Sequence, residues 1–178
     1  RYVAPHLLMQ YIIAAFLPEP LQTELAQLRA ELDIWSGYWL PPHMTIIRPF
    51  SIELSATDIA EILRPVHCTA QLVRWSSFRN PGANVVFLEV AQAPFQQLRR
   101  DLLVRVPKLG QGDKSGDPEA QFAENPHYHL TVAAHIPDNM INQVLSKVSQ
   151  KTYLNVFQLN KINLFFREGN GFWETVFK

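Results

Sequence analysis

The chain has 178 residues, of which 47% are hydrophobic and 18% are charged, and its formal net charge is zero. A chain of this length can bury roughly 70% of the surface that it exposes when unfolded, so residues 1–178 are expected to form one globular domain, or two small lobes that share a core, and the composition argues against an intrinsically disordered protein. Zero net charge counts against a strong, sequence-independent grip on long nucleic acid, because such binding grows with the number of phosphates neutralised. Any nucleic-acid substrate is therefore expected to be held at one end.

The most apolar stretch near the N-terminus, Leu7 to Leu17, is too short to span a bilayer. It also lacks the basic flank and cleavage site of a signal peptide. The single cysteine, Cys68, cannot form an internal disulfide and fits a reducing compartment. We therefore expect a buried strand at Leu7 to Leu17 in a soluble, cytoplasmic protein without membrane attachment.

The first half of the chain alternates strand and helix patterns. After the first strand, Pro20 opens a helix in which leucines recur at helical spacing. A second strand, His43 to Arg48, ends its regular pairing at Pro49. Thr57 can then cap a helix that must stop before Pro65.

The middle of the chain predicts a hairpin and another helix. The strands Thr69 to Phe78 and Val85 to Val90 are joined by the turn-forming sequence Arg79-Asn80-Pro81-Gly82. Pro94 then opens a helix that ends before the next proline. The segment Lys108 to Asn125 is rich in polar residues, glycine and proline, which is typical of a mobile and often functional loop.

The second half repeats the order of strand, helix and hairpin. It comprises the strand His129 to Ile136, a helix opened by Pro137 and Asp138, and the strand pair Asn155 to Arg167 and Phe172 to Phe177. This repeated order indicates a diverged internal duplication. The expected fold class is α+β and bilobal, with two pseudo-symmetric, mainly antiparallel sheets, helices outside and a central cleft.

The tripeptide His-x-Thr stands at the start of a strand in each half. The copies are His43-Met44-Thr45 and His129-Leu130-Thr131, and the equivalent residues are 86 positions apart. Residues two apart in a strand point to the same face, so each copy presents its His and Thr side by side. One copy alone would most often be a polar patch in a strand, but two copies in matching context predict one shared site.

Two imidazoles and two hydroxyls around one cavity suit chemistry on a phosphate ester. Imidazole, with an unperturbed pKa of about 6.5, accepts or donates a proton near neutrality. Phosphodiester cleavage needs a base for the attacking oxygen and an acid for the departing one, and His43 and His129 are the candidates. The hydroxyls of Thr45 and Thr131 can donate to the non-bridging phosphate oxygens. This assembly requires no metal and no cofactor.

Further residues are candidates for contacting the substrate, each with an ordinary structural alternative. His127 is expected at the edge of the cleft, where it helps to orient the substrate or the neighbouring motif histidine; a metal-ligand role is disfavoured because HExxH, CxxC and a carboxylate cluster are missing. Arg79 and Arg167 lie near hairpin turns and can reach a phosphate, or are simply solvated. Several aromatic residues are candidate stacking surfaces for a base, or core residues: Phe50, Phe78, Tyr128, Phe166 and Trp173.

Other residue patterns argue against a role in the site. A serine hydrolase is disfavoured because Gly-x-Ser-x-Gly does not occur and Ser115-Gly116 lies in a polar loop. Strand alternation points Arg48 away from His43 and Thr45, so a packing or ion-pair role fits it as well as a place in the pocket does. The histidines without a partner motif are expected to be structural or at the surface: His6, His67 and His135.

Through PHMTIIRPF, PHYHLTVA and the element order of nearly the whole chain, the sequence resembles the two-histidine (2H) phosphoesterase superfamily, in particular its bacterial branch of 2'-5' RNA ligase-like or cyclic phosphodiesterase-like proteins. The resemblance implies a bilobal α+β fold with pseudo-twofold symmetry, in which His43, Thr45, His129 and Thr131 take the catalytic positions. Members of that family typically open 2',3'-cyclic phosphates to leave a 2'-phosphate, and some join RNA ends through 2'-5' linkages.

The resemblance therefore implies a metal-independent cyclic phosphodiesterase in RNA processing, with His129 as the base and His43 as the acid. Its substrate would be a cyclic nucleotide or an RNA 3' end with a cyclic phosphate, and no obligate protein partner is expected. The alternatives are a 2'-5' RNA ligase, a phosphodiesterase for ADP-ribose 1'',2''-cyclic phosphate, and a nucleotide-binding module without turnover. Retention of both His-x-Thr motifs favours catalysis.

Overall fold

The computed structural model describes residues 9–32, 40–110, 127–153, 155–169 and 171–176. Its elements follow in the order β1 (Met9–Phe16), α1 (Leu21–Leu32), β2 (His43–Phe50), α2 (Ala56–Ile62), β3 (Cys68–Phe78), β4 (Asn84–Val90), α3 (Gln92–Arg105), the 3₁₀ helix η1 (Pro107–Gly110), β5 (His129–Ile136), α4 (Ile141–Ser149), β6 (Val156–Leu159), β7 (Asn163–Glu168) and β8 (Glu174–Thr175). The fold class is α+β, as predicted.

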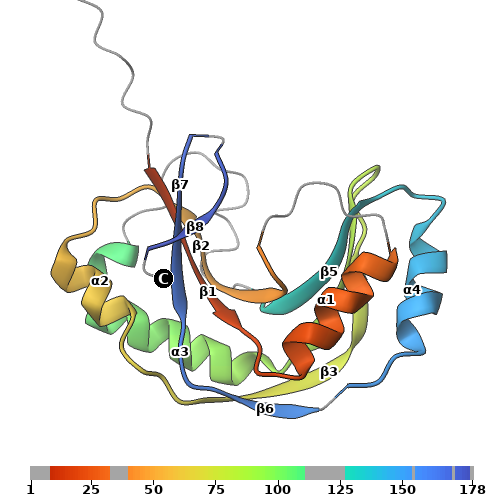
Figure 1. Cartoon of the computed structure of the whole chain (residues 1–178), viewed down its shortest axis with the longest axis horizontal. Helices are drawn as coiled ribbons and strands as arrows, with labels where there is room; N and C mark the ends of the chain where they lie inside the picture. Colours follow the sequence, from red (N-terminus) through yellow and green to blue (C-terminus); the bar gives the residue numbers. More distant parts are fainter. Residues whose placement is uncertain (1–8, 33–39, 111–126, 154, 170, 177–178) are drawn as a thin grey trace, which may run out of the picture.

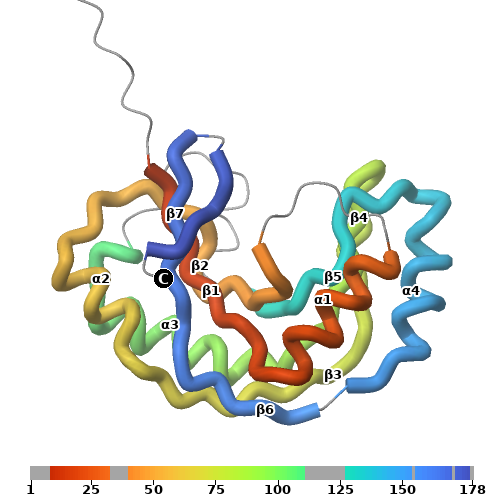
Figure 2. Tube along the Cα trace, viewed as in Figure 1, coloured from red at the N-terminus to blue at the C-terminus, as the bar shows by residue number. Residues whose placement is uncertain are grey.

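The strands form one eight-stranded sheet in the order β6-β3-β4-β5-β2-β1-β7-β8, with antiparallel neighbours. The two strands that begin with His-x-Thr, β2 and β5, are central neighbours, joined by the register pair Met44 and Leu130. The two expected sheets are therefore the two halves of one sheet. In Figure 2 the half with β1 and β7 and the half with β4 and β5 form the two sides of a U.

Each half of the sheet is packed by a helix that follows a strand of the other half. Helix α1 comes directly after β1 but packs against β5, and α3 comes directly after β4 and packs against β2 as well as against β3 of its own half. Helix α4 packs on β3 and β4, and Figure 1 shows it beside α1 on the β5 side of the molecule. The unit of strand, helix and motif strand thus occurs twice, as β1-α1-β2 and as β4-α3-β5.

The main hydrophobic core lies on the helix-covered face of the sheet. Met44 and Leu130, 0% and 1% exposed, belong to it together with leucines of α1 and α3. A smaller cluster on the opposite face of β1 and β7 contains Ile12, Ala14, Leu40 and Phe165, with Phe16 and Trp173 packed against it. Because the motif histidines and threonines flank Met44 and Leu130 along their strands, they lie on this second face.

Several local predictions hold and others need correction. Helix α1 buries the predicted leucines, Leu21, Leu25, Leu28 and Leu32, and β5 has the predicted bounds. Helix α2 is capped by Ser55 rather than Thr57, because Ser55 and Asp58 form a capping box. Helix α4 begins at Ile141, later than predicted, since Asp138 instead accepts hydrogen bonds from Asn84 and from the main chain of Gly82.

The predicted strand Asn155 to Arg167 is two strands in different halves of the sheet. Strand β6 pairs with β3, and β7 pairs with β1 and with β8. The chain therefore crosses between the halves after β6. Of the predicted loop, Lys108 to Gly110 belong to η1, and residues 111–126 lie outside the described residues. Within the described ranges, every helix is too short or too polar to cross a membrane.

Candidate active site

The pairing of Met44 with Leu130 sets the two motifs against each other. Because β2 and β5 are antiparallel, the residues that flank this pair stand opposite one another: His43 opposite Thr131, and Thr45 opposite His129. Each histidine therefore has one threonine beside it in its own strand and the other opposite it in the neighbouring strand. The structure brings the four motif side chains to one place on one face of the sheet.

Both motif histidines are held by the main chain in the same way. Nδ1 of His43 lies 2.8 Å from the carbonyl oxygen of Pro41, and Nδ1 of His129 lies 2.8 Å from that of His127. A carbonyl oxygen only accepts hydrogen bonds, so Nδ1 carries the proton in each ring. Nε2 is consequently the nitrogen that can take a proton from a substrate or give one to it.

Both imidazoles favour the neutral form in the free protein. Burial, with a smaller contribution from the charge of Arg29, lowers the pKa of His43 to about 4. Burial likewise lowers the pKa of His129 to about 4, with added contributions from His127, Arg48 and His43. The influence of one motif histidine on the other places the two rings within electrostatic range. An anionic phosphate beside them would favour the protonated forms again.

Arg29 of α1 is a residue of this site that sequence reasoning did not single out. Its Nη2 donates to the carbonyl oxygen of Thr131 at 2.7 Å, and its Nη1 donates to that of Leu40 at 3.0 Å. The guanidinium thus ties a helix of the first half to the motif strand of the second. In sequence, Arg29 is one polar residue of an amphipathic helix, and only the packing of α1 on β5 reveals its place.

Arg48 lies on the motif face, and the prediction that it points away was wrong. Ile46 and Ile47 are consecutive, yet both belong to the main core, because the register of β1 with β2 shifts between Ile47 and Thr45. Such a β-bulge reverses the side-chain alternation beyond it. The charge of Arg48 accordingly contributes to the lowered pKa of His129. Arg48 is therefore a candidate for holding a phosphate oxygen.

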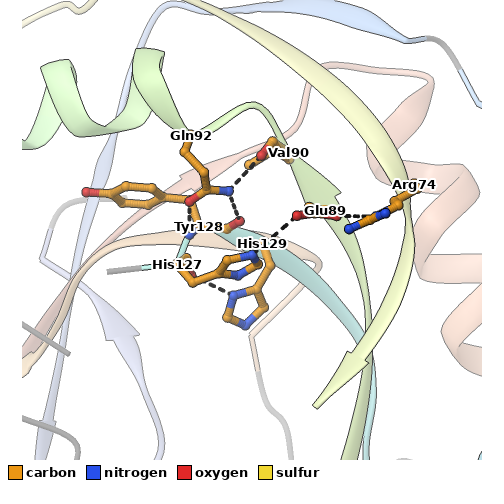
Figure 3. Close-up of polar contacts among 7 residues, drawn as sticks. All are labelled: Arg74, Glu89, Val90, Gln92, His127, Tyr128 and His129. Carbon is orange, nitrogen blue, oxygen red and sulfur yellow. Dashed lines mark hydrogen bonds and ion pairs between the residues drawn. The ribbon is translucent and has the colours of Figure 1, made fainter. Parts of the chain in front are cut away.

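His127 lies beside His129 in a polar cluster, as Figure 3 shows. The two imidazole centroids are 5.6 Å apart. Nε2 of His127 lies 3.6 Å from Oε1 of Glu89, and Nε of Arg74 donates to Oε2 of Glu89 at 2.6 Å. His127 thus stands next to the motif histidine, as expected, and is paired with a carboxylate.

Phe78 is the stacking candidate that the structure brings to the motif histidines. Its ring lies edge-on to His127 and His129, at centroid distances of 5.5 and 5.1 Å, and packs against Phe87 at 4.4 Å. Phe78 is 37% exposed, whereas Phe87 is 2% exposed. An apolar ring with solvent access therefore adjoins His129.

Tyr128 and Phe50 are not placed to contact a substrate. Tyr128 is 1% exposed and packs on Phe95 in the main core, with ring centroids 5.6 Å apart, and burial raises the pKa of its hydroxyl to about 12. Phe50 is 4% exposed and stacks on Tyr11 at 5.7 Å. Tyr128 stands between two residues of the motif face, so strand alternation turns it to the core. We withdraw both residues as candidates for substrate contact.

The two arginines near hairpin turns have partners within the protein. Nη2 of Arg79 donates to Oδ1 of Asn142 on α4 at 2.9 Å. Arg167 donates to Oε1 of Gln10 at 2.9 and 2.7 Å and lies 4.6 Å from the ring centroid of Trp173. Along β7, Arg167 lies on the same face as Phe165 of the smaller apolar cluster, whereas Leu164 and Phe166 lie on the opposite face. Arg167 therefore remains a candidate for contacting a substrate that extends over the half of the sheet with β1 and β7.

The described residues contain no group of three or more His, Cys, Asp or Glu side chains that could hold a metal ion. Among the histidines without a partner motif, His67 and His135 are exposed, as expected, and His6 lies outside the described residues.

Comparisons with known proteins match nearly the whole chain to one family. Residues 17–171 match the sequence model of the 2'-5' RNA ligase superfamily. A protein of Bacillus licheniformis that carries the provisional name of phosphoesterase is 26% identical over 179 residues, which cover 96% of each chain.

Two solved structures share the fold. LigT of Escherichia coli, solved with 3'-AMP, is 16% identical with a TM-score of 0.54, over 94% of this chain and 95% of LigT. Usb1 of Kluyveromyces marxianus is 11% identical with a TM-score of 0.50, over 95% of this chain and 97% of Usb1.

Proposed function

Because the chain belongs to the 2'-5' RNA ligase superfamily, we propose that it is a metal-independent cyclic phosphodiesterase that opens 2',3'-cyclic phosphates at RNA ends or on nucleotides. The family supports a phosphoesterase, and the geometry of the motifs supports this reaction within it. The observation that carries the proposal is the Met44–Leu130 pair, which makes the His-x-Thr ends of β2 and β5 neighbours, with each imidazole held at Nδ1 by a main-chain carbonyl.

In the proposed reaction, Nε2 of His129 takes a proton from water while the water oxygen bonds to phosphorus. The bond between phosphorus and the 3'-oxygen breaks, and Nε2 of His43 gives a proton to that oxygen. The product is a 2'-phosphate, and solvent then resets both rings. Each proton transfer typically contributes about 10² to 10⁴ in rate.

The remaining groups of the site would act on the phosphate itself. The hydroxyls of Thr45 and Thr131 can donate to the non-bridging oxygens, where negative charge grows in the transition state. Arg48 adds a positive charge near His129. Because the pKa of His43 is about 4 in the free protein, the acid must gain its proton as the anionic substrate binds.

The nucleotide substrate class has support from one structural relative. LigT of Escherichia coli was solved with 3'-AMP and shares this fold. The family description also favours a second candidate, 2'-5' RNA ligation. In that direction the 5'-hydroxyl of a second RNA would attack the cyclic phosphate in place of water, with the same base and the same acid.

The test is to incubate the protein with 2',3'-cyclic nucleotides and with short RNAs that end in a cyclic phosphate, in the presence of EDTA, and to follow phosphorus NMR. A 2'-phosphate product supports hydrolysis, and a 2'-5' linkage formed with a 5'-hydroxyl RNA supports ligation. ADP-ribose 1'',2''-cyclic phosphate serves as a competing substrate. Turnover that persists when His43→Ala is combined with His129→Ala would overturn the mechanism.

The control variant is His67→Ala, which removes an exposed histidine outside the motifs and is expected to leave turnover unchanged. Tight binding of a mononucleotide with no turnover of any of these substrates would replace the enzyme with a nucleotide-binding module.

A further inference from the structure

The near symmetry of the two motifs breaks at the residues that surround each histidine. On the neighbouring strand, Phe16 pairs with His43, whereas Glu89 pairs with His129. The carbonyl that holds His43 belongs to Pro41, whereas the one that holds His129 belongs to His127. At these two places the first histidine has apolar neighbours, with the charge of Arg29 acting on it from α1, whereas the second has a carboxylate and an imidazole.

The carboxylate of Glu89 is anchored from the next strand. Arg74 pairs with Glu89 across β3 and β4, and its Nε donates to Oε2 at 2.6 Å. The bond from Arg74 holds the pKa of Glu89 below its ordinary value, and His127 lowers it further. Glu89 is thus a charged group, fixed at one oxygen by Arg74 and facing His127 at 3.6 Å with the other. Figure 3 shows it between the two.

His127 is fixed to His129 through both its main chain and its ring. Its carbonyl oxygen accepts from Nδ1 of His129, and its ring lies 5.6 Å from the ring of His129. Phe78 and Phe87 pack against both rings, at centroid distances between 4.9 and 5.5 Å. A charge on His127 would therefore act on His129 over a short distance and with little screening, because apolar rings surround both imidazoles.

We propose that His127 is a positioning residue for His129, that Glu89 and Arg74 control it, and that this network makes His129 the base of the pair. The proposal rests on the proposed function. The interaction with His127 adds to the effect of burial in lowering the pKa of His129 and so favours its neutral form, the form that a base requires. The negative charge of Glu89 opposes this lowering of the pKa of His129, and Arg74 reduces the effect of Glu89 by pairing with its carboxylate. The other charged groups that act on His129 are His43 and Arg48 of β2.

The proposal predicts opposite shifts for two variants. His127→Gln removes a group whose electrostatic interaction lowers the pKa of His129, so the midpoint of protonation of His129 should rise. Coulomb's law at 5.6 Å, with an effective dielectric between those of a protein surface and water, gives a rise of about 0.5 to 2 pH units. Glu89→Gln removes the opposing negative charge, so the midpoint should fall.

The test is an NMR titration of the imidazole signals in the free protein. His127→Gln should raise the midpoint of His129 and leave that of His43 in place, and Glu89→Gln should lower it. In a protein that carries both changes, the effect of Glu89→Gln should vanish. An effect that persists there undiminished would show that Glu89 acts directly on His129 and would overturn the network. An unchanged midpoint in His127→Gln would overturn the role of His127.

Two further variants protect the test against misfolding and general charge effects. Arg74 has a side chain that is 72% exposed, so Arg74→Gln should fold normally, and it should raise the midpoint by freeing the charge of Glu89. Glu61→Gln breaks an ion pair with Arg64 elsewhere and should leave both motif histidines unchanged.

The titration uses no substrate, so its outcome does not depend on whether the proposed function is correct. If the enzyme is active, the pH dependence of kcat/KM also tests whether His129 is the base. Movement of the acidic limb to higher pH in His127→Gln supports His129 as the base. Movement of the basic limb instead would overturn that assignment.

Discussion

Met44 pairs with Leu130 at the centre of the sheet, and this pair joins the two halves of the protein. Both side chains are buried among the helices, on the face away from the motif histidines. The packing of two apolar residues in the core therefore determines how two polar motifs meet on the other face.

Met44→Ala should weaken both the fold and the site. Met44 is 0% exposed, so its truncation leaves a cavity at the join and should cost about 2 to 5 kcal/mol of unfolding free energy. Misalignment of the motifs should also lower kcat. Urea unfolding and steady-state kinetics measure the two effects. Met9→Ala, at a methionine that is 37% exposed, is the matched control and should change neither quantity.

Thr45→Val and Thr131→Val should each lower kcat by about 10²-fold to 10³-fold, because each removes a donor to the charged transition state. Val keeps the shape of Thr, so stability should change little. Thr→Ser at either position keeps the hydroxyl and should retain most of the activity. Thr69→Val, at an exposed threonine on β3, controls for the loss of a hydroxyl. Equal kcat in Thr45→Val and the unchanged protein would remove that threonine from the mechanism.

Binding of a nucleoside 2'-phosphate should take up protons. The pKa values of His43 and His129 are about 4 in the free protein, so both rings are neutral at pH 7, and a bound phosphate favours their protonated forms. Affinity should therefore increase as the pH falls from 7 toward 5. Calorimetry in two buffers of different ionisation enthalpy measures the uptake. A pH-independent affinity would contradict the lowered pKa values.

The same two histidines should make the protein sensitive to acid. Their pKa values in the folded state, about 4, lie below the unfolded value of about 6.5, so the unfolded chain binds more protons between these limits. Stability is therefore complete above pH 6.5 and falls as the pH drops toward 4, by up to about 3 kcal/mol for each histidine. His129→Gln should flatten the dependence measured by urea unfolding, whereas His67→Ala should not.

Tyr128→Phe should leave activity unchanged and raise stability slightly. The hydroxyl of Tyr128 is buried and has no hydrogen-bond partner among the described residues, and its removal ends a desolvation cost of about 1 to 3 kcal/mol. Tyr128→Ala should instead destabilise by about 3 to 5 kcal/mol through the cavity that it leaves. Thermal unfolding and kcat test both statements. Reduced nucleotide affinity in Tyr128→Phe would restore Tyr128 as a substrate contact.

Sequence patterns predicted the parts of the fold that depend on local periodicity. The leucines of α1 and the bounds of β5 follow from helical and strand spacing, and both are confirmed. The two His-x-Thr strands were expected to meet, and β2 and β5 are neighbours. Which residues of the site do the chemistry stays a prediction until the variants are measured.

Residues that depend on tertiary detail could not be predicted in this way. Arg48 was assigned to the wrong face, because a bulge in β2 reverses the alternation after Thr45. Arg29 carried no local signal, since its partner Thr131 is 102 positions away. Glu89 and Arg74 follow from strand register alone, which a single sequence does not reveal. Tyr128 was the exception, because alternation along β5 would have placed it in the core.

The exchange of helices between the halves makes each half dependent on the other for the packing of its motif strand. Helix α1 covers β5, and α3 covers β2, so a cut anywhere between the two motifs separates β5 from its covering helix. One copy of the strand, helix and motif strand unit is therefore not self-sufficient. In the intact chain, each unit contributes a helix that packs against the motif strand of the other unit.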